Sequence, residues 1–255
     1  MPTDPRRAAV IDRLVAAGCV AATEEADAYL AAAPDAVTLD AWLDRREQGE
    51  PPAWILGSLR FAGRTVLVDR GVYVPRRQSE ELARRAAALL PRHGRAIDLC
   101  TGAGAIAAHL RDAVPSAFVI GLDIDARAAA CARRNGVPTI VADLDTPVHR
   151  EPGFDVVVAV APYVPTPELR LLPADVVRHE PPVALDGGPE GLDLVRRVVL
   201  AAARLLQPGG ALLTEIGGDQ DEQLAPALAI AGFVDVTAWH DEDGDLRGIA
   251  ARRGH

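Results

Sequence analysis

A glycine-rich turn and the acidic residues around it have the types and spacing for binding a nucleotide-like ligand. The apolar run 96–99 leads into a turn where Gly102, Gly104 and Ala107 follow the G-x-G-x-x-G/A spacing of nucleotide-binding turns. A turn with so few side chains lets a ligand lie directly against the backbone. The spacing alone fits a dinucleotide enzyme equally well.

The charge around this turn favours a ligand without phosphate. Asp98 lies just ahead of the turn, and Asp123 and Asp143 follow the next two apolar runs. A pyrophosphate binds helix N-terminal N–H groups and disfavours a nearby carboxylate. S-adenosylmethionine has a ribose diol, an exocyclic amine and positive charge, and no phosphate, so we expect it as the cofactor. A nicotinamide cofactor is the first alternative, and the second is that each acid only caps a helix or a loop.

Composition limits the other function classes. The 255 residues are 49% hydrophobic and 4% aromatic, which fits one α/β domain with a smaller appendage. The formal charge of −9 argues against a dedicated nucleic-acid binder, so we expect no direct nucleic-acid partner. The chain contains no lysine, which excludes Schiff-base, pyridoxal and P-loop chemistry.

The cysteines and histidines indicate a reduced, metal-free protein. Cys19, Cys100 and Cys131 are far apart and odd in number, which is typical of free thiols in the cytoplasm. The histidines form no ligand cluster, so we expect no metal, and His179 is expected in a loop rather than as a base. The polar N-terminus and the absence of an apolar run of ~20 residues predict a soluble protein without membrane contact.

The first 75 residues read as a helical region followed by a hairpin. Helices are predicted over 7–17, 23–33 and 39–47, with Thr23 and Thr38 as N-caps and Gly18 as a helix stop. Residues 49–52 read as a loop, and 59–69 predict a β-hairpin that turns near Ala62 and Gly63.

The rest of the chain alternates strands with helices, which predicts an α/β doubly wound, Rossmann-like sheet. Strands are expected near 95–99, 118–122, 139–142, 155–160 and 211–215, and helices near 79–90, 104–112, 125–134 and 190–206. Two further strands, 234–240 and 247–251, close the sheet. We therefore divide the chain into a helical domain (1–57), a hairpin linker (58–75) and a catalytic domain (76–255).

Eight short motifs give the chain a specific resemblance. They are 46–51 (REQGEP), 74–80 (VPRRQSE), 98–107 (DLCTGAGAIA), 162–164 (PYV), 179–181 (HEP), 184–188 (ALDGG), 191–193 (GLD) and 215–217 (EIG). Together they resemble, nearly end to end, the HemK or PrmC-like protein glutamine N5-methyltransferases that modify release factors or a ribosomal protein. The resemblance implies a class I S-adenosylmethionine-dependent methyltransferase fold with an N-terminal substrate-docking domain.

The resemblance also implies roles for the residues around the turn. Residues Cys100, Thr101, Gly102, Ala103 and Gly104 are expected to wrap the methionine portion of the cofactor. Asp123 is expected to bind the ribose, and Asp143 with Leu144 to border the adenine. Asp98, Ile124 and Val160 complete the expected cofactor-binding set.

The expected methyl-acceptor turn lacks its main polar residue. The family has Asn-Pro-Pro-Tyr after the fourth strand, where this chain has Val160, Ala161, Pro162 and Tyr163. In the family the Asn side chain helps to hold the glutamine amide, a poor nucleophile, and valine offers no side-chain hydrogen bond. Losing one such bond costs roughly 1–3 kcal/mol, which is about 5- to 150-fold in rate or affinity.

We therefore expect a methyltransferase of the glutamine N5 type with an altered acceptor site. The only asparagine of the chain, Asn135, follows the second strand and lies away from the acceptor turn. A small-molecule nitrogen or oxygen acceptor is one alternative to a release-factor-like or ribosomal protein substrate. Another is a cofactor-binding protein with little turnover. Glu180 and Glu215 are candidate supporting acids, although a structural role suits each of them better.

Overall fold

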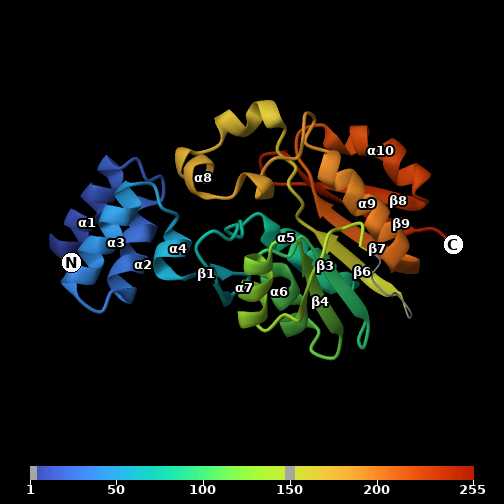
Figure 1. Cartoon of the computed structure of the whole chain (residues 1–255), viewed down its shortest axis with the longest axis horizontal. Coiled ribbons are helices and arrows are strands. Elements are labelled where there is room, and N and C mark those ends of the chain that lie inside the picture. The colour runs from blue at the N-terminus through green and yellow to red at the C-terminus, as the bar shows by residue number, and fades with distance from the viewer. Residues whose placement is uncertain (1–4, 147–152) are drawn as a thin grey trace.

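A helical segment, a β-hairpin and a seven-stranded sheet follow one another along the chain (Figure 1). The computed structural model describes residues 5–146 and 153–255. The helical segment lies at one end of the molecule and the hairpin connects it to the sheet (Figure 1). Among the described residues, no helix has the length and apolar character needed to cross a membrane.

The helical segment folds around its own small core. Its helices are α1 (Pro5–Ala16), α2 (Ala22–Ala32), α3 (Ala36–Glu47) and α4 (Pro52–Leu56). Leu14, Tyr29 and Leu43, one from each of the first three helices, are fully buried against one another and against Ile55 of α4. Gly18, with φ of +78°, follows the end of α1 as predicted.

Two predicted helix caps are wrong. Helix α3 begins at Ala36 because the carboxylate of Asp35 accepts a hydrogen bond from the N–H of Thr38 at 2.7 Å, so Thr38 lies inside the first turn. Helix α2 begins at Ala22, before Thr23, and the preceding Ala21 makes no side-chain cap. Helix α4 lies partly where a loop was expected, since Pro52 occupies a first-turn position that tolerates proline.

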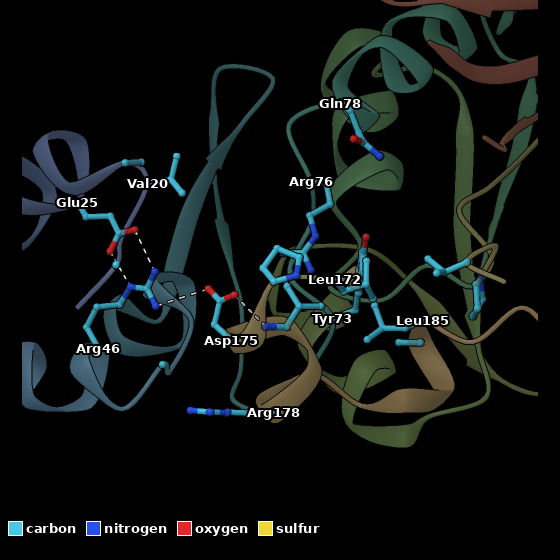
Figure 2. Close-up of a pocket in the computed structure, with 18 of the residues that line it drawn as sticks. Val20, Glu25, Arg46, Tyr73, Arg76, Gln78, Leu172, Asp175, Arg178 and Leu185 are labelled. Atoms are coloured by element: carbon cyan, nitrogen blue, oxygen red, sulfur yellow. Dashed lines mark hydrogen bonds and ion pairs between the residues drawn. The ribbon is translucent and has the colours of Figure 1, made fainter. Parts of the chain in front are cut away.

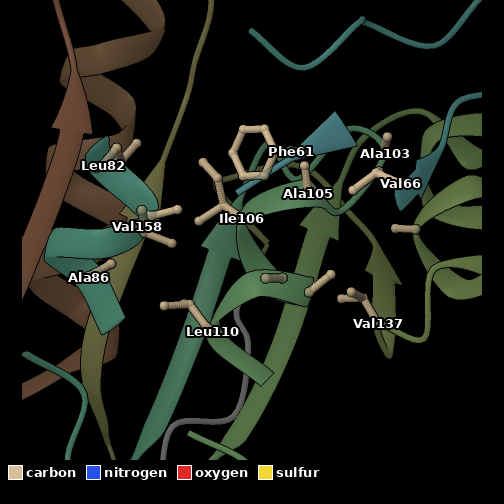
Figure 3. Close-up of a cluster of buried hydrophobic side chains, with 14 of the residues drawn as sticks. Phe61, Val66, Leu82, Ala86, Ala103, Ala105, Ile106, Leu110, Val137 and Val158 are labelled. Carbon is tan, nitrogen blue, oxygen red and sulfur yellow. The ribbon is translucent and has the colours of Figure 1, made fainter. Parts of the chain in front are cut away.

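The hairpin has the predicted position. Strands β1 (Ser58–Phe61) and β2 (Arg64–Leu67) pair in antiparallel fashion. Ala62 and Gly63 form the turn with positive φ angles of 46° and 82°. Phe61 and Val66 are buried in the same hydrophobic cluster as Ile106 (Figure 3), so the hairpin packs against α6 (Ala105–Ala113) beside the central sheet.

The central sheet has the order β5-β4-β3-β6-β7-β9-β8. Its strands are β3 (Arg95–Leu99), β4 (Phe118–Asp123), β5 (Thr139–Val141), β6 (Phe154–Ala159), β7 (Leu206–Glu215), β8 (Phe233–His240) and β9 (Leu246–Arg253). The first five strands of this order run parallel, and β9 is antiparallel to both β7 and β8. The strand order reverses between β3 and β6, and ligands of such sheets bind beside this reversal at the carboxyl ends of the strands.

Helices cover both faces of the sheet. Helices α5 (Ser79–Leu89), α6 (Ala105–Ala113) and α7 (Ala126–Arg134) pack on one face, where Leu82, Leu110 and Val158 share a cluster (Figure 3). Helices α9 (Asp193–Leu205) and α10 (Gln220–Ile230) pack on the other face. The predicted doubly wound architecture and the closing strand pair are confirmed, whereas β7 begins earlier than predicted and α10 was not predicted at all.

A long connection joins β6 to α9 and crosses the carboxyl edge of the sheet. It contains the 3-10 helices η1 (Thr166–Leu171) and η2 (Pro182–Ala184) and the short helix α8 (Ala174–His179). His179 therefore ends a helix, and its predicted loop position is wrong. We call residues 164–191 the strap.

Candidate functional site

Two cavities meet at the carboxyl edge of the sheet. The smaller cavity, about 200 Å³, is lined by the glycine turn, the ends of β4 and β5, the linker and α9. The larger cleft, about 810 Å³, lies between the helical segment, the strap and the turn after β6. Four residues line both spaces: Tyr73, Val160, Pro162 and Ala184. The two spaces therefore share one wall, at the turn that follows β6.

The two glycines of the turn are required for different structural reasons. Gly102 has φ of +55° and lines the smaller cavity, and a Cβ placed there would meet no atom within 4 Å. Gly104 has φ of +79°, and its Cβ would lie 2.9 Å from the Cβ of Ala132 in α7. Gly102 thus leaves open space for a ligand, whereas Gly104 allows α6 to pack against α7.

Asp98 supports the turn from behind. Its Oδ2 accepts hydrogen bonds from the hydroxyl of Thr101 at 2.7 Å and from the N–H of Ala107 at 3.2 Å. Burial raises the pKa of this carboxyl to about 7, against the effect of both hydrogen bonds. Asp98 is absent from the cavity lining, so its role in the structure is to hold the glycine turn and the start of α6.

Asp123 reaches the smaller cavity from the end of β4. Its two carboxylate oxygens accept hydrogen bonds from the N–H of Gly102 at 2.8 Å and the N–H of Asp125 at 2.9 Å. Burial raises the pKa of Asp123, and these backbone hydrogen bonds oppose the shift. The same contacts fix the carboxylate beside the open backbone of the turn.

Asp143 follows β5 and forms an ion pair with Arg197 of α9. Arg197 also contacts Oδ2 of Asp145 at 2.9 Å, and it lines the cavity together with Asp143 and Leu144. Its positive charge is therefore shared between two carboxylates and is poorly available for a phosphate.

The structure brings most of the predicted cofactor residues to the smaller cavity. Its lining contains Cys100, Gly102, Asp123, Ile124, Asp143, Leu144 and Val160. Asp98, Thr101, Ala103 and Gly104 do not line it and lie behind or beside the turn. Sequence reasoning missed Gly71, Val72, Tyr73, Leu194 and Arg197. The linker and α9 reach the cavity through long-range contacts for which no local motif exists.

The predicted acceptor turn forms part of the larger cleft, with all four of its residues in the lining. The Nε2 of Gln78 donates a hydrogen bond to the hydroxyl of Tyr163 at 2.9 Å, and burial raises the pKa of Tyr163. The Nε2 of Gln220 donates to the Tyr163 carbonyl at 2.9 Å. These contacts hold the turn from both sides, whereas Val160 and Ala161 add only apolar side chains.

An ion pair and a hydrogen bond join the helical segment to the strap across the cleft. Arg46 is buried, and its guanidinium contacts Glu25 at 2.7 Å and Asp175 of α8 at 3.5 Å (Figure 2). The Nε2 of His179 lies 3.1 Å from the carbonyl oxygen of Gln48. The helical segment and the strap therefore each form a wall of the cleft. These contacts hold the two walls together.

The two candidate acids lie near the acceptor turn but outside the cleft lining. Glu180 accepts a hydrogen bond from the N–H of Val74 at 3.2 Å and pairs with Arg76, so it anchors the linker. Glu215 is buried at the end of β7, and neither of its oxygens has a hydrogen-bond partner among the described residues. Burial raises the pKa of Glu215, which nearby Ser79, Gln78 and Tyr163 partly oppose.

The chemistry of the smaller cavity fits S-adenosylmethionine. Gly102 leaves room for close backbone approach, and the carboxylates of Asp123 and Asp143 suit hydroxyl, amine and cationic groups. Val72, Leu122 and Leu144 give apolar walls suited to a flat ring. Arg197, the one arginine that the described part of the chain adds to the lining, is already paired, which disfavours a dinucleotide.

Comparisons with known proteins agree with this chemistry. A family model described as a methyltransferase domain matches residues 96–180. The release factor glutamine methyltransferase of Geobacter sulfurreducens is 35% identical over 216 residues, which are 82% of this chain and 76% of that protein. A 4-amino-L-phenylalanine/4-methylamino-L-phenylalanine methyltransferase of Streptomyces pristinaespiralis is 38% identical over 191 residues, or 70% of this chain and 65% of that protein.

A solved structure supports the fold. The ribosomal protein L11 methylase of Lactobacillus delbrueckii subsp. bulgaricus has a TM-score of 0.53 and 18% identity, covering 74% of this chain and 84% of that one. The parallel sheet with its antiparallel closing strands is the class I methyltransferase fold. The chain is thus an S-adenosylmethionine-dependent methyltransferase, and it belongs to the family of the release factor glutamine methyltransferases.

Proposed function

We propose that this enzyme methylates the side-chain amide nitrogen of a glutamine on a protein substrate that enters the larger cleft. The observation that carries the proposal is the wall shared by the two spaces. It borders a cleft of about 810 Å³ whose far side is the helical segment. A cleft bounded by a second domain suits a protruding protein segment, and the family relatives are named for a protein acceptor.

Different residues around the smaller cavity bind different parts of the cofactor. We assign the ribose to Asp123, the adenine edge to Asp143 and Leu144, and the methionine portion to the turn from Cys100 to Gly104. Asp98 acts on this turn indirectly, through Thr101 and Ala107. The helical domain (1–57) docks the substrate, the linker (58–75) connects it, and the catalytic domain (76–255) holds both reactants.

Methyl transfer at this wall depends mainly on alignment. S-adenosylmethionine supplies a methyl group on a sulfonium sulfur, which is an excellent leaving group. The acceptor nitrogen forms the new N–C bond as the S–C bond breaks, sulfur keeps the electron pair, and a proton leaves the nitrogen for water in the cleft. Val160, Ala161 and Pro162 supply a rigid apolar surface beside the reacting atoms.

A second candidate acceptor is a small aromatic amine. The Streptomyces pristinaespiralis relative is named for 4-amino-L-phenylalanine. The side chains of Val160 and Ala161 suit an amine, which needs less polar help than an amide because its lone pair is not delocalised into a carbonyl.

A direct assay separates the two acceptors. The full-length enzyme is incubated with S-adenosylmethionine and either an intact release factor or 4-amino-L-phenylalanine, and the products are analysed by mass spectrometry. The proposal expects a new methyl group on a glutamine of the protein. Methylation of the amine alone would replace it with the second candidate.

A further inference from the structure

Among the residues that the structure describes, the wall shared by the smaller cavity and the larger cleft has one polar side chain. Of the four residues that line both spaces, Val160, Pro162 and Ala184 have only hydrocarbon side chains, and Tyr73 has a hydroxyl. We propose that the Tyr73 hydroxyl holds the acceptor nitrogen at this wall, in place of the asparagine that the acceptor turn lacks. This inference rests on the proposed function, because it concerns the same methyl transfer.

The backbone on both sides of Tyr73 is held firmly. The carbonyl of Val72 accepts a hydrogen bond from the indole Nε1 of Trp54 at 2.9 Å, and the N–H of Val74 donates to Glu180 at 3.2 Å. These bonds tie the linker to the helical segment on one side and to the strap on the other. Tyr73 therefore has a fixed place at the wall, as positioning of a weak nucleophile requires.

Arg76 steadies the ring of Tyr73. Its guanidinium carbon lies 5.0 Å from the ring centroid, and Figure 2 shows the two side chains together on the wall of the cleft. Arg76 is also paired with buried Glu180, so its charge is balanced without the substrate. The contact with Arg76 therefore restricts the movement of the Tyr73 ring away from the wall.

The phenol has the right hydrogen-bonding chemistry. Burial raises the pKa of Tyr73 to about 12, against the opposing effect of Arg76, so the hydroxyl is neutral near pH 7. Its oxygen can accept the N–H of a glutamine amide or an amine, which turns the nitrogen lone pair toward the methyl group. After transfer, the phenol oxygen takes the proton from the nitrogen as the hydroxyl releases its own proton to water in the cleft, so the phenol is neutral before and after the step.

The other polar groups of the cleft are placed less suitably. Gln78 and Tyr163 bond to each other at 2.9 Å, and neither lines the cofactor cavity. Arg178 belongs to α8 and lines the larger cleft but not the smaller cavity (Figure 2). Within residues 5–146 and 153–255, Tyr73 alone combines a hydrogen-bonding side chain with a place in the lining of both spaces.

The chain offers a matched test, because it has three tyrosines. Tyr73→Phe removes the hydroxyl and keeps the ring over which Arg76 lies. We expect kcat to fall about 10-fold or more, while the dissociation constant of S-adenosylmethionine, measured by calorimetry, stays unchanged. Tyr29→Phe is the control, since the Tyr29 hydroxyl is buried in the helical segment without a hydrogen-bond partner among described residues. It should keep the kcat of the unmodified enzyme.

A rescue variant excludes a merely structural role. Val160→Asn returns an amide to the acceptor turn, so in the Tyr73→Phe background it should restore much of the lost kcat. A Tyr73→Phe enzyme that retains full kcat, that loses cofactor binding, or that Val160→Asn cannot rescue would overturn the assignment.

The assay is run with both a release factor and 4-amino-L-phenylalanine, so the two proposals fail separately. Activity of the unmodified enzyme on the amine alone would reject the glutamine acceptor, and the Tyr73 comparison would then be made on the amine. Inactivity toward both acceptors would reject the proposed function and the Tyr73 assignment together.

Discussion

The side chain of Asn135 binds both main-chain polar groups of Leu67. Its Oδ1 accepts the Leu67 N–H at 2.8 Å, and its Nδ2 donates to the Leu67 carbonyl at 2.8 Å. The same Nδ2 donates to the carbonyl of Ala103 in the glycine turn, also at 2.8 Å. One buried side chain at the end of α7 thus connects the hairpin to the glycine turn.

Asn135→Ala should therefore destabilise the whole protein. Three hydrogen bonds at about 1 kcal/mol each predict a loss of roughly 3 kcal/mol, which corresponds to a Tm lower by about 6–12 °C in a chain of this size. Differential scanning calorimetry measures the change. Gln223→Ala, at an exposed position of α10, is the control and should leave Tm nearly unchanged. An equally small change for Asn135→Ala would contradict the role assigned to this contact.

The two glycines of the cofactor turn should respond differently to alanine. At Gly102 the new methyl enters open space at the cavity, so cofactor affinity should fall about 10-fold with a modest loss of stability from the positive φ. At Gly104 the methyl meets Ala132 at 2.9 Å, so stability should fall more than at Gly102. Calorimetric titration and thermal melts separate the effects, and the reverse pattern would show that the glycine roles are exchanged.

Asp98 should make the cofactor-free protein less stable as pH rises. Its folded pKa of about 7 lies above the ordinary aspartate pKa of 3.8, so the folded state holds the proton more tightly than the unfolded state between these values. The stabilising contribution is fully present below about pH 4, is lost as pH rises to about 7, and stays constant above that. Asp98→Asn removes this dependence, so its Tm relative to the unmodified protein should be higher near pH 8 than near pH 5. An identical Tm difference at both pH values would rule out a raised pKa.

Arg46 should stabilise the contact between the helical segment and the strap. Arg46→Ala leaves the nearly buried Glu25 without its partner, which predicts a loss of about 3 kcal/mol and a higher KM for a protein substrate. Arg7→Ala, which removes an exposed ion pair with Asp27 in the same helical segment, should change Tm little. Thermal melts and substrate titrations of both variants provide the test. Equal effects of the two substitutions would mean that burial of Arg46 has no energetic consequence.

The sequence predicts the sheet and much of the smaller cavity because those signals are local. Apolar runs that end at Asp123 and Asp143 mark strand ends, and parallel strands bring their carboxyl ends to one edge. The glycine spacing is also a local signal, and it correctly predicts that Gly102 lies at the cavity.

The remaining parts depend on contacts between distant segments. Tyr73 reaches the site from the linker and Arg197 reaches it from α9. No local sequence motif identifies either residue as part of the site. Asp98 precedes the turn in sequence, yet its side chain points to Thr101 and Ala107 behind it. Helix α10 was missed because Pro226 interrupts a short, alanine-rich segment that shows weak apolar periodicity.

The most direct test of the account is a calorimetric titration of S-adenosylmethionine into the unmodified protein, Asp123→Ala and Asp112→Ala. Asp123 lines the smaller cavity, whereas Asp112 is an exposed residue of α6 that the cavity does not include. The account predicts binding at one site, at least about 10-fold weaker binding by Asp123→Ala, and unchanged binding by Asp112→Ala. Undiminished affinity in Asp123→Ala, or no binding by the unmodified protein, would contradict the placement of the cofactor on which the rest of the account depends.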